Sequence, residues 1–299
     1  MNIIKLFTTK VSLTCQGITR YYKNKRLKKR ILSFYNDNIT NDEEIIAALN
    51  YIKKHEVTVF PYLFNNKYNS KNVTLYKDES SGLYYVLRQD KKLYLRRDIT
   101  YKTARNLYNS LLIEQDPESP HRYLTKDFDI KENDILVDIG CAEGFLPLDV
   151  IEKVKKVYLF EYEDLWIEAL LKTFAPWKNK VEIIKGYVSD KTDDSQITID
   201  EYFKNIDEKP TFIKIDVEGA EMKVLKGMEQ TINLSKEIKL AVCTYHRKDD
   251  YNEITSYISS KGLDYETSNR YMLFENVEPY FRRGLIRVVK QSTENNSSL

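Results

Sequence analysis

The chain has 299 residues, 42% of them hydrophobic, so it can form one large or two ordinary domains around a sizeable core. Basic and acidic residues almost cancel to a net charge of +2, which disfavours a dedicated nucleic-acid binder. The three cysteines form no CxxC pair, which excludes the usual cysteine zinc motifs and favours a reducing compartment.

The N-terminal sequence and the hydropathy pattern predict a cytoplasmic protein. No apolar run approaches the ~20 residues of a membrane span. Lys10, Arg20 and Lys23 interrupt any apolar segment that could serve as a signal peptide.

Residues 1–125 predict a smaller α+β region. A capping-box pattern at 40–43 predicts the start of a helix, the turn residues at 77–82 predict an antiparallel hairpin, and a second helix is expected over 103–113. The strands expected here cover 57–60, 73–76, 83–88 and 93–95.

Lys23 to Arg30 places six basic residues in eight. A solvated helix face is the favoured interpretation of this run. The alternative is an anionic partner or a peripheral membrane contact.

Residues 126–290 show a different pattern, in which short β-rich runs alternate with amphipathic helical segments. Such alternation predicts an α/β domain with a mostly parallel sheet covered by helices on both faces, which binds ligands at the carboxyl ends of its strands. One helix is expected over 220–232, and another near 254–258 is closed by Gly262. The tail, 291–299, is expected to be disordered. The expected strands are 135–139, 157–161, 181–185, 212–216, 240–245, 263–266, 271–274 and 285–289.

The string VDIGCAEG (137–144) follows the first strand of this domain. Gly140 permits a tight turn, and Gly144 allows the next helix to approach the sheet closely. Asp138 can accept a hydrogen bond from an ammonium group or can position a loop. The pattern is also compatible with simple strand-to-helix geometry.

Glu161 ends the second strand, 21 residues after Gly140. An acid at this spacing typically binds ribose hydroxyls. An ordinary exposed acid is the alternative.

Two further strings place polar residues at the same edge of the sheet. FIKIDVEGAE (212–221) puts Asp216 at a strand end, with Glu218 just after it. TYHRKDD (244–250) puts His246 after the neighbouring strand, where it is expected to act as a base or a ligand, although a lone histidine is often structural.

In order and spacing, VDIGCAEG, LFEYED, FIKIDVEGAE and TYHRKDD resemble the FkbM-type methyltransferases, over roughly 114–290. The resemblance implies the class I methyltransferase fold, with strand order 3-2-1-4-5-7-6. It implies S-adenosylmethionine as methyl donor and O-methylation, often of sugars or secondary metabolites.

The resemblance also implies site residues. Asp138, Gly140 and Gly144 would hold the methionine part of the cofactor, Glu161 the ribose, and Val188 and Ser189 would flank the adenine. Cys141 and Tyr162 are also expected to contact the cofactor. His121 or Arg122, in the loop before the domain, could face the substrate or the cofactor carboxylate. Ala142 and Tyr162 depart from the glycine and proline common at these places.

Two mechanisms for removing the acceptor proton stay open. His246 could act as base with help from Asp216. A divalent metal, Mg²⁺ by its preference for oxygen, could instead bind among Asp216, Glu218 and His246. The expected acceptor is a saccharide hydroxyl or a related small metabolite, for instance a polysaccharide precursor.

Three alternatives differ in function. A nicotinamide enzyme is disfavoured because the third glycine of GxGxxG is missing. A non-catalytic binding module would use the same fold. A nucleic-acid methyltransferase would use the basic run at Lys23 to Arg30, against the near-neutral charge of the chain.

Overall fold

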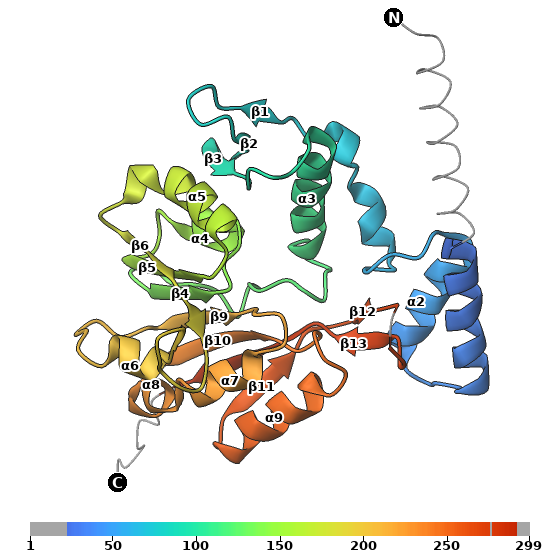
Figure 1. The fold of residues 1–299 in the computed structure, drawn as a ribbon. Coiled ribbons are helices and arrows are strands. Elements are labelled where there is room, and N and C mark those ends of the chain that lie inside the picture. Colours follow the sequence, from blue (N-terminus) through green and yellow to red (C-terminus); the bar gives the residue numbers. More distant parts are fainter. Residues whose placement is uncertain (1–22, 276, 292–299) are drawn as a thin grey trace, which may run out of the picture.

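The computed structural model of the chain describes residues 23–275 and 277–291, and the predicted disordered tail lies almost wholly outside them. A seven-stranded sheet organises the larger part of the molecule, in the order β11-β14-β10-β9-β4-β5-β6 (Figure 1). Numbered along the chain within this sheet, the order is 3-2-1-4-5-7-6, which confirms the expected fold. Only β14 runs antiparallel to its neighbours. The strands are β4 (Ile135–Ile139), β5 (Lys156–Glu161), β6 (Val181–Lys185), β9 (Phe212–Ile215), β10 (Ile238–Cys243), β11 (Asp264–Thr267) and β14 (Leu285–Lys290).

Helices cover both faces of the sheet because its strands are apolar on both sides. Leu136 and Leu159 pack on one face with α3, α4 and α5, whereas Val137 and Phe160 pack on the other with α6 to α9. The helices are α3 (Tyr101–Glu114), α4 (Phe145–Val150), α5 (Asp164–Thr173), α6 (Ile199–Phe203), α7 (Glu221–Lys226), α8 (Glu229–Leu234) and α9 (Asp250–Ser260). Short elements between them are η3 (Ala175–Trp177) and the paired strands β7 (Tyr187–Val188) and β8 (Gln196–Ile197).

The single helix expected over 220–232 is wrong, because α7 ends at Lys226 and α8 begins at Glu229. Gly227 packs so tightly that a Cβ there would lie 2.0 Å from the carbonyl oxygen of Ser189. The Asp200 carboxylate accepts the backbone N–H groups of Gln230 and Thr231, which caps the new helix. The expected end of α9 at Gly262 is confirmed by its left-handed φ of 67°.

The N-terminal part contains α2 (Glu43–Lys54), η1 (Leu63–Lys67), η2 (Ser70–Asn72) and an antiparallel sheet of β1 (Tyr76–Lys77), β2 (Tyr84–Arg88) and β3 (Lys91–Tyr94). The hairpin shares a core with the large sheet, since Val86 and Leu93 belong to the same cluster as Leu136. The Arg88 guanidinium also pairs with Asp149 and lies 3.8 Å from the ring centre of Phe145. The division near residue 125 stays a prediction, and residues on both sides of it build one core.

Three expected details of the elements are wrong. Asp42, rather than Thr40, caps α2, because its carboxylate accepts the N–H groups of Glu44 and Ile45. Residues 57–60 form no strand; the Val59 carbonyl makes one backbone hydrogen bond to Leu273. The run at 271–274 lies outside the large sheet, as β12 (Tyr271–Leu273), which pairs with the unpredicted β13 (Phe281–Arg283).

Residues 23–37 form a helix that carries the basic run. Lys28 donates to the carbonyl oxygens of Lys53 and His55, at the end of α2, and Arg30 donates to that of Glu275. The other basic side chains of the run are exposed or half-buried. Within residues 23–275 and 277–291, no helix combines the length and the apolar character needed to cross a bilayer.

Candidate functional site

A pocket opens at the carboxyl ends of β4, β5 and β9, the edge where a sheet of this topology binds its ligands. Of the residues expected to bind a cofactor, Gly140, Glu161, Tyr162 and Val188 line it. The aromatic residues Trp166 and Tyr187 and the acidic residues Glu163, Asp216 and Glu218 also line it.

The turn at Gly140 forms the floor between β4 and β9. Its φ of 73° is left-handed, and a Cβ there would lie 2.0 Å from the carbonyl oxygen of Asp216. Only glycine allows the two strand ends to approach this closely. The turn therefore fixes Asp216 beside the pocket.

The Glu161 carboxylate is held in place by three backbone N–H groups. Oε2 accepts from Ala142 at 2.9 Å, and Oε1 accepts from Tyr162 at 2.7 Å and from Glu163 at 2.9 Å. Ala142 has a left-handed φ of 46°, which belongs to the same tight turn. A buried, fixed carboxylate at the second strand end can accept hydroxyl hydrogen bonds from a ligand without reorganising.

Four of the expected cofactor residues lie outside the pocket lining. Asp138 is buried beneath the turn, where Oδ1 lies 2.9 Å from Nζ of Lys214. Cys141 packs into the apolar core, and a Cβ on Gly144 would meet the Phe174 ring at 2.7 Å. Ser189 is fully buried and donates to Asp190. In this structure, Asp138 pairs with a buried charge, and the other three residues pack within the fold next to the pocket turn or the core.

Lys214 is a buried cation that sequence reasoning missed. Besides contacting Asp138, its Nζ donates to the Gly140 carbonyl oxygen at 2.6 Å, so it ties β9 to the turn. Burial lowers its pKa, but the charges of Asp138 and Asp216 outweigh burial and raise the pKa above its usual value. A charged residue inside the apolar run FIKI was the signal for this role.

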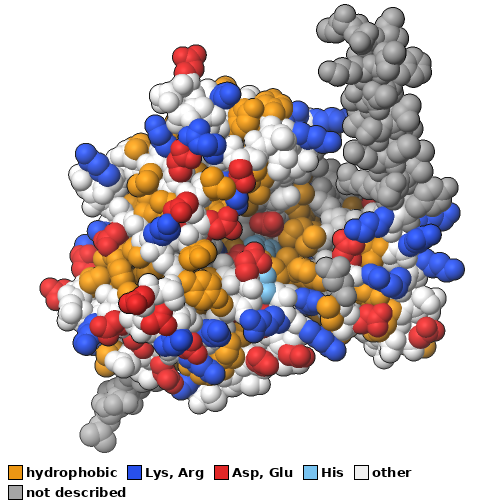
Figure 2. All heavy atoms as spheres, viewed as in Figure 1, with side chains coloured by type: hydrophobic (Ala, Val, Ile, Leu, Met, Phe, Trp, Pro, Cys, Tyr) orange, Lys and Arg blue, Asp and Glu red, His pale blue; other side chains and the backbone are white. Residues whose placement is uncertain are grey.

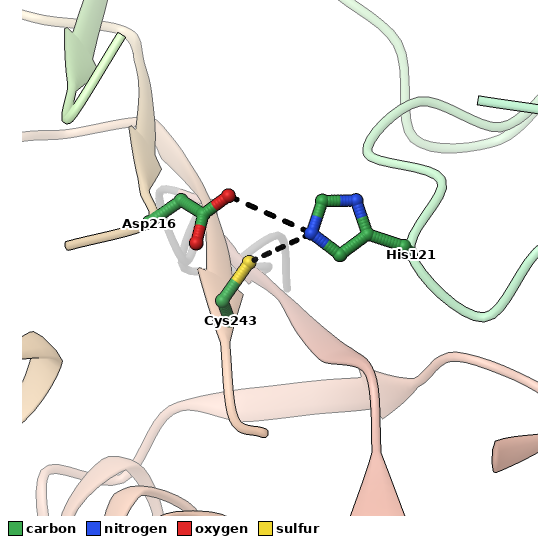
Figure 3. A group of neighbouring side chains, drawn as sticks. All are labelled: His121, Asp216 and Cys243. Atoms are coloured by element: carbon green, nitrogen blue, oxygen red, sulfur yellow. Dashed lines mark hydrogen bonds and ion pairs between the residues drawn. The ribbon is translucent and has the colours of Figure 1, made fainter. Parts of the chain in front are cut away.

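Asp216 accepts hydrogen bonds from two tyrosine hydroxyls and lies beside His121, which also contacts Cys243 (Figure 3). Oδ2 accepts from the Tyr123 hydroxyl at 2.7 Å, and Oδ1 accepts from the Tyr245 hydroxyl at 3.2 Å. His121 points its Nε2 atom toward Asp216 Oδ2, at 3.5 Å, and toward Cys243 Sγ, at 3.8 Å. The cluster joins the loop before the domain to the ends of β9 and β10.

The charges around Asp216 keep it ionised. Burial alone would raise its pKa, but the contact with His121 and the charges of Lys214 and His246 hold the pKa well below its usual range. A permanent carboxylate beside the pocket can stabilise positive charge on a ligand or on a neighbouring imidazole.

His246 lies beside this carboxylate, as the sequence predicts, and its side chain is only 8% exposed. Its Nδ1 atom lies 2.8 Å from Oε1 of Glu221, and its Nε2 atom lies 3.5 Å from both Asp216 Oδ1 and Glu218 Oε2. Burial lowers the pKa of His246, but Glu221, Asp216 and Glu218 together raise it above 6.5.

The remaining expected site residues differ in where their side chains point. His121 faces Asp216, whereas Arg122 turns away and donates to the carbonyl oxygens of Leu124 and Gln115. Glu218 is 93% exposed at the pocket rim, with a left-handed φ of 54°. Tyr123, Tyr245 and Glu221 were missed as members of the site; their positions at strand and loop ends were the available signal.

Two further carboxyl groups, the buried Glu143 and the half-buried Glu114, lie near this cluster. Burial, reinforced by the charges of Glu114 and Asp138, raises the pKa of Glu143 to about 8. Burial likewise raises the pKa of Glu114, and the charge of Asp216 adds to it. Figure 2 shows a hollow in this face of the molecule, with histidine at its base between acidic and hydrophobic side chains.

The Mg²⁺ site expected among Asp216, Glu218 and His246 stays a prediction. Ligand atoms of Asp216, Glu221 and His246 lie within 4.8 Å of one another. However, both Asp216 oxygens already accept tyrosine hydroxyls, and Glu221 Oε1 accepts the N–H groups of Val217 and Gly219. Mg²⁺ requires about six oxygen ligands in octahedral geometry, and these side chains are committed to one another.

A family of known proteins matches more than half of the chain. A family model described as the methyltransferase FkbM domain matches residues 98–266. A probable cobalt-precorrin-6B C(15)-methyltransferase of Methanocaldococcus jannaschii is 32% identical over 65 residues, which are 21% of this chain and 36% of that protein.

Two solved structures are similar to parts of this chain. A methyltransferase FkbM from Methylobacillus flagellatus is 21% identical with a TM-score of 0.45, over 65% of this chain and 56% of that one. The fibrillarin pre-rRNA processing protein of Methanococcus jannaschii is 14% identical with a TM-score of 0.44, over 74% of this chain and 98% of that one. The chain spans 36% of the length of the precorrin methyltransferase and 56% of the length of the M. flagellatus protein.

Proposed function

Because this chain belongs to the FkbM methyltransferase family, we propose that it transfers a methyl group from S-adenosylmethionine to a hydroxyl group of a saccharide or a related small metabolite. The observation that carries this proposal is the position of the fixed Glu161 carboxylate, in a pocket that also contains Asp216. Glu161 can accept hydrogen bonds from the hydroxyls of a ribose, and Asp216 lies next to His246, the candidate base.

The pocket suits an adenosine ligand in shape and chemistry. Glu161 can accept two ribose hydroxyl hydrogen bonds, since its oxygens are held by backbone donors and face the pocket. Tyr162, Trp166 and Val188 provide aromatic and apolar surface for a flat base. The bound cofactor would supply an electrophilic methyl group on a sulfonium.

His246 would accept the acceptor's proton at Nε2. Nδ1 lies 2.8 Å from the Glu221 carboxylate, which favours a proton on Nδ1 and leaves Nε2, 3.5 Å from Asp216, as the nitrogen that would take up the acceptor's proton. The imidazolium formed after proton transfer would be stabilised by Asp216 and Glu221. Alignment of acceptor, methyl group and sulfur would supply much of the remaining acceleration.

Several features support a hydroxyl acceptor. A hydroxyl group is a weak nucleophile that needs a base, and the site offers one. The Tyr245 ring stacks on Phe274, with centroids 5.4 Å apart and an interplanar angle of 15°, beside the hydroxyl cluster at Asp216. The stack holds the Tyr245 ring in place, so its hydroxyl stays beside Asp216, where it could contact a sugar hydroxyl.

The proposal is tested by label transfer from methyl-labelled S-adenosylmethionine to a panel of monosaccharides, nucleotide sugars, oligosaccharides and RNA. We expect label on a saccharide, lost in His246→Ala. Label on RNA alone would overturn the acceptor class and assign a role to the basic residues of 23–30. Cofactor binding with no transfer to any acceptor, in lysate fractions as well as pure compounds, would support a non-catalytic binding module.

A further inference from the structure

The hairpin of β12 and β13 is an addition to the large sheet, and it follows the stretch matched by the family model. Its apolar side chains, Leu273 and Phe281 among them, form a cluster with Ile52 and Phe64 of the N-terminal part. Leu273 also donates its N–H to the Val59 carbonyl oxygen. The hairpin therefore packs between the large sheet and the N-terminal part, with α2 on its far side (Figure 1).

The front of the hairpin touches the turn that carries His246. Nη1 of Arg282 donates to two successive carbonyl oxygens, of Tyr245 at 2.8 Å and of His246 at 3.0 Å. The same guanidinium lies 4.7 Å from the ring centre of Phe274, which stacks on the Tyr245 ring. One arginine thus holds the backbone of the turn, and its aromatic neighbour holds the side chain that precedes His246.

The position of the Arg282 side chain leaves one of its buried polar atoms unpaired within the part of the chain that the structure describes. The Nε atom of Arg282 is buried and has no hydrogen-bond partner among the described residues. Leaving a buried polar group unpaired destabilises the folded state. An apolar residue would pack against Phe274 without this cost, so the guanidinium points to a function at the turn.

Resting on the proposed role of His246 as base, we propose that Arg282 is a positioning residue, which fixes the 245–246 turn so that His246 Nε2 faces Asp216 while Nδ1 faces Glu221. The side chain acts through the backbone of the turn and contacts no reacting atom. Arg282 thereby links the β12–β13 hairpin to the edge of the sheet that carries His246.

The neighbouring Arg283 provides a matched control on the same strand. Its guanidinium pairs with Glu44 and lies 3.8 Å from the Tyr271 ring centre, so it holds the hairpin to the N-terminal part. Loss of Arg283 weakens that support without removing a contact to the 245–246 turn.

The test uses imidazole ¹H–¹⁵N spectra of the full chain, which has three histidines to assign. In the unmodified protein, we expect a His246 Nδ1 proton protected from water by Glu221. Arg282→Met should lose this protected signal, Arg282→Lys should retain it, and Arg283→Met should leave it unchanged. Phe274→Leu, which changes no charge, should weaken the protection and serves as the second variant if Arg282→Met does not fold.

A protected proton that survives in both Arg282→Met and Phe274→Leu would overturn the proposal, as would equal loss in Arg283→Met. S-adenosylmethionine affinity of Arg282→Met should stay within about twofold of the unmodified protein, with turnover falling roughly 10- to 100-fold, because a shift of about 1 Å has such an effect. If the unmodified chain binds no S-adenosylmethionine, the proposed function fails, while the spectra still decide the role of Arg282.

Discussion

Nδ1 of His246 lies 2.8 Å from Oε1 of Glu221, a buried carboxylate at the start of α7. That contact turns the opposite ring nitrogen, Nε2, toward Asp216 at the edge of the pocket. The orientation of the imidazole is therefore set by an acid whose position in the first helical turn otherwise indicates only a favourable interaction with the helix dipole.

His246→Ala should separate cofactor binding from chemistry. We expect S-adenosylmethionine affinity to stay within about twofold, because His246 is not in the lining of the pocket. Turnover should fall by roughly 10² to 10⁴, the usual contribution of a positioned base. Calorimetry and label transfer on the same preparation measure both quantities, and unchanged turnover would remove His246 from the mechanism.

Glu221→Gln should lower the pKa of His246, since Glu221 contributes most to raising it. The neutral imidazole would then be available at lower pH, so the acid limb of the rate profile should move to lower pH. Imidazole chemical shifts followed against pH give the midpoint directly. Glu218→Gln is the control: its carboxylate is 93% exposed and 3.5 Å away, so its effect should be smaller. Equal shifts in the two variants would contradict the assignment.

Glu143→Gln should change how stability depends on pH. Burial raises the pKa of Glu143 from 4.5 to about 8, so the folded protein holds a proton that the unfolded chain releases near 4.5. Stability is therefore lost as pH rises from 4.5 through about 8. The variant, which cannot ionise, should match the unmodified protein near about pH 5 and exceed it by about 4 kcal/mol near about pH 9. Urea unfolding at both pH values tests this, and parallel curves would refute it.

Gly140→Ala and Gly262→Ala form a matched pair. Both glycines are left-handed, with φ of 73° and 67°, but only at Gly140 would the added Cβ strike backbone, whereas nothing lies within 4 Å at Gly262. We expect Gly262→Ala to cost about 1 kcal/mol, from backbone conformation alone. Gly140→Ala should cost about 3 kcal/mol or more and abolish cofactor binding, because the turn and Asp216 must separate. Similar unfolding free energies for the two variants would show that the close approach is unimportant.

The centre of the large sheet could be predicted from the sequence because β4, β5, β9 and β10 are mostly apolar runs, each followed by a helix. The same logic failed at 271–274, where a strand of similar composition pairs with β13 instead of joining the sheet. Residues 220–232 keep helical spacing throughout, yet the helix is interrupted at Gly227. Gly227 packs closely against Ser189, and this contact between distant parts of the sequence could not be predicted.

The candidate site was predictable where a residue follows a strand directly. Gly140, Glu161, Asp216 and His246 all lie at the expected edge of the sheet. Partners that arrive from elsewhere were not predictable. The Tyr123 hydroxyl reaches Asp216 across 93 residues of sequence.

Local spacing could not separate residues that face the pocket from residues beneath it. Asp138 occupies the strand position typical of a ligand residue. Its carboxylate faces Lys214 under the Gly140 turn, which no spacing in one chain reveals.

The central claim is that the pocket beside Glu161 binds S-adenosylmethionine. Calorimetric titration of S-adenosylmethionine into the unmodified chain and into Glu161→Ala tests it most directly, with NAD as a competitor and with EDTA present. We expect saturable binding that EDTA and NAD leave unchanged and that Glu161→Ala weakens roughly 10-fold or more, through loss of charged hydrogen bonds to ribose. Equal binding by both proteins, or no binding to the folded chain, would contradict it.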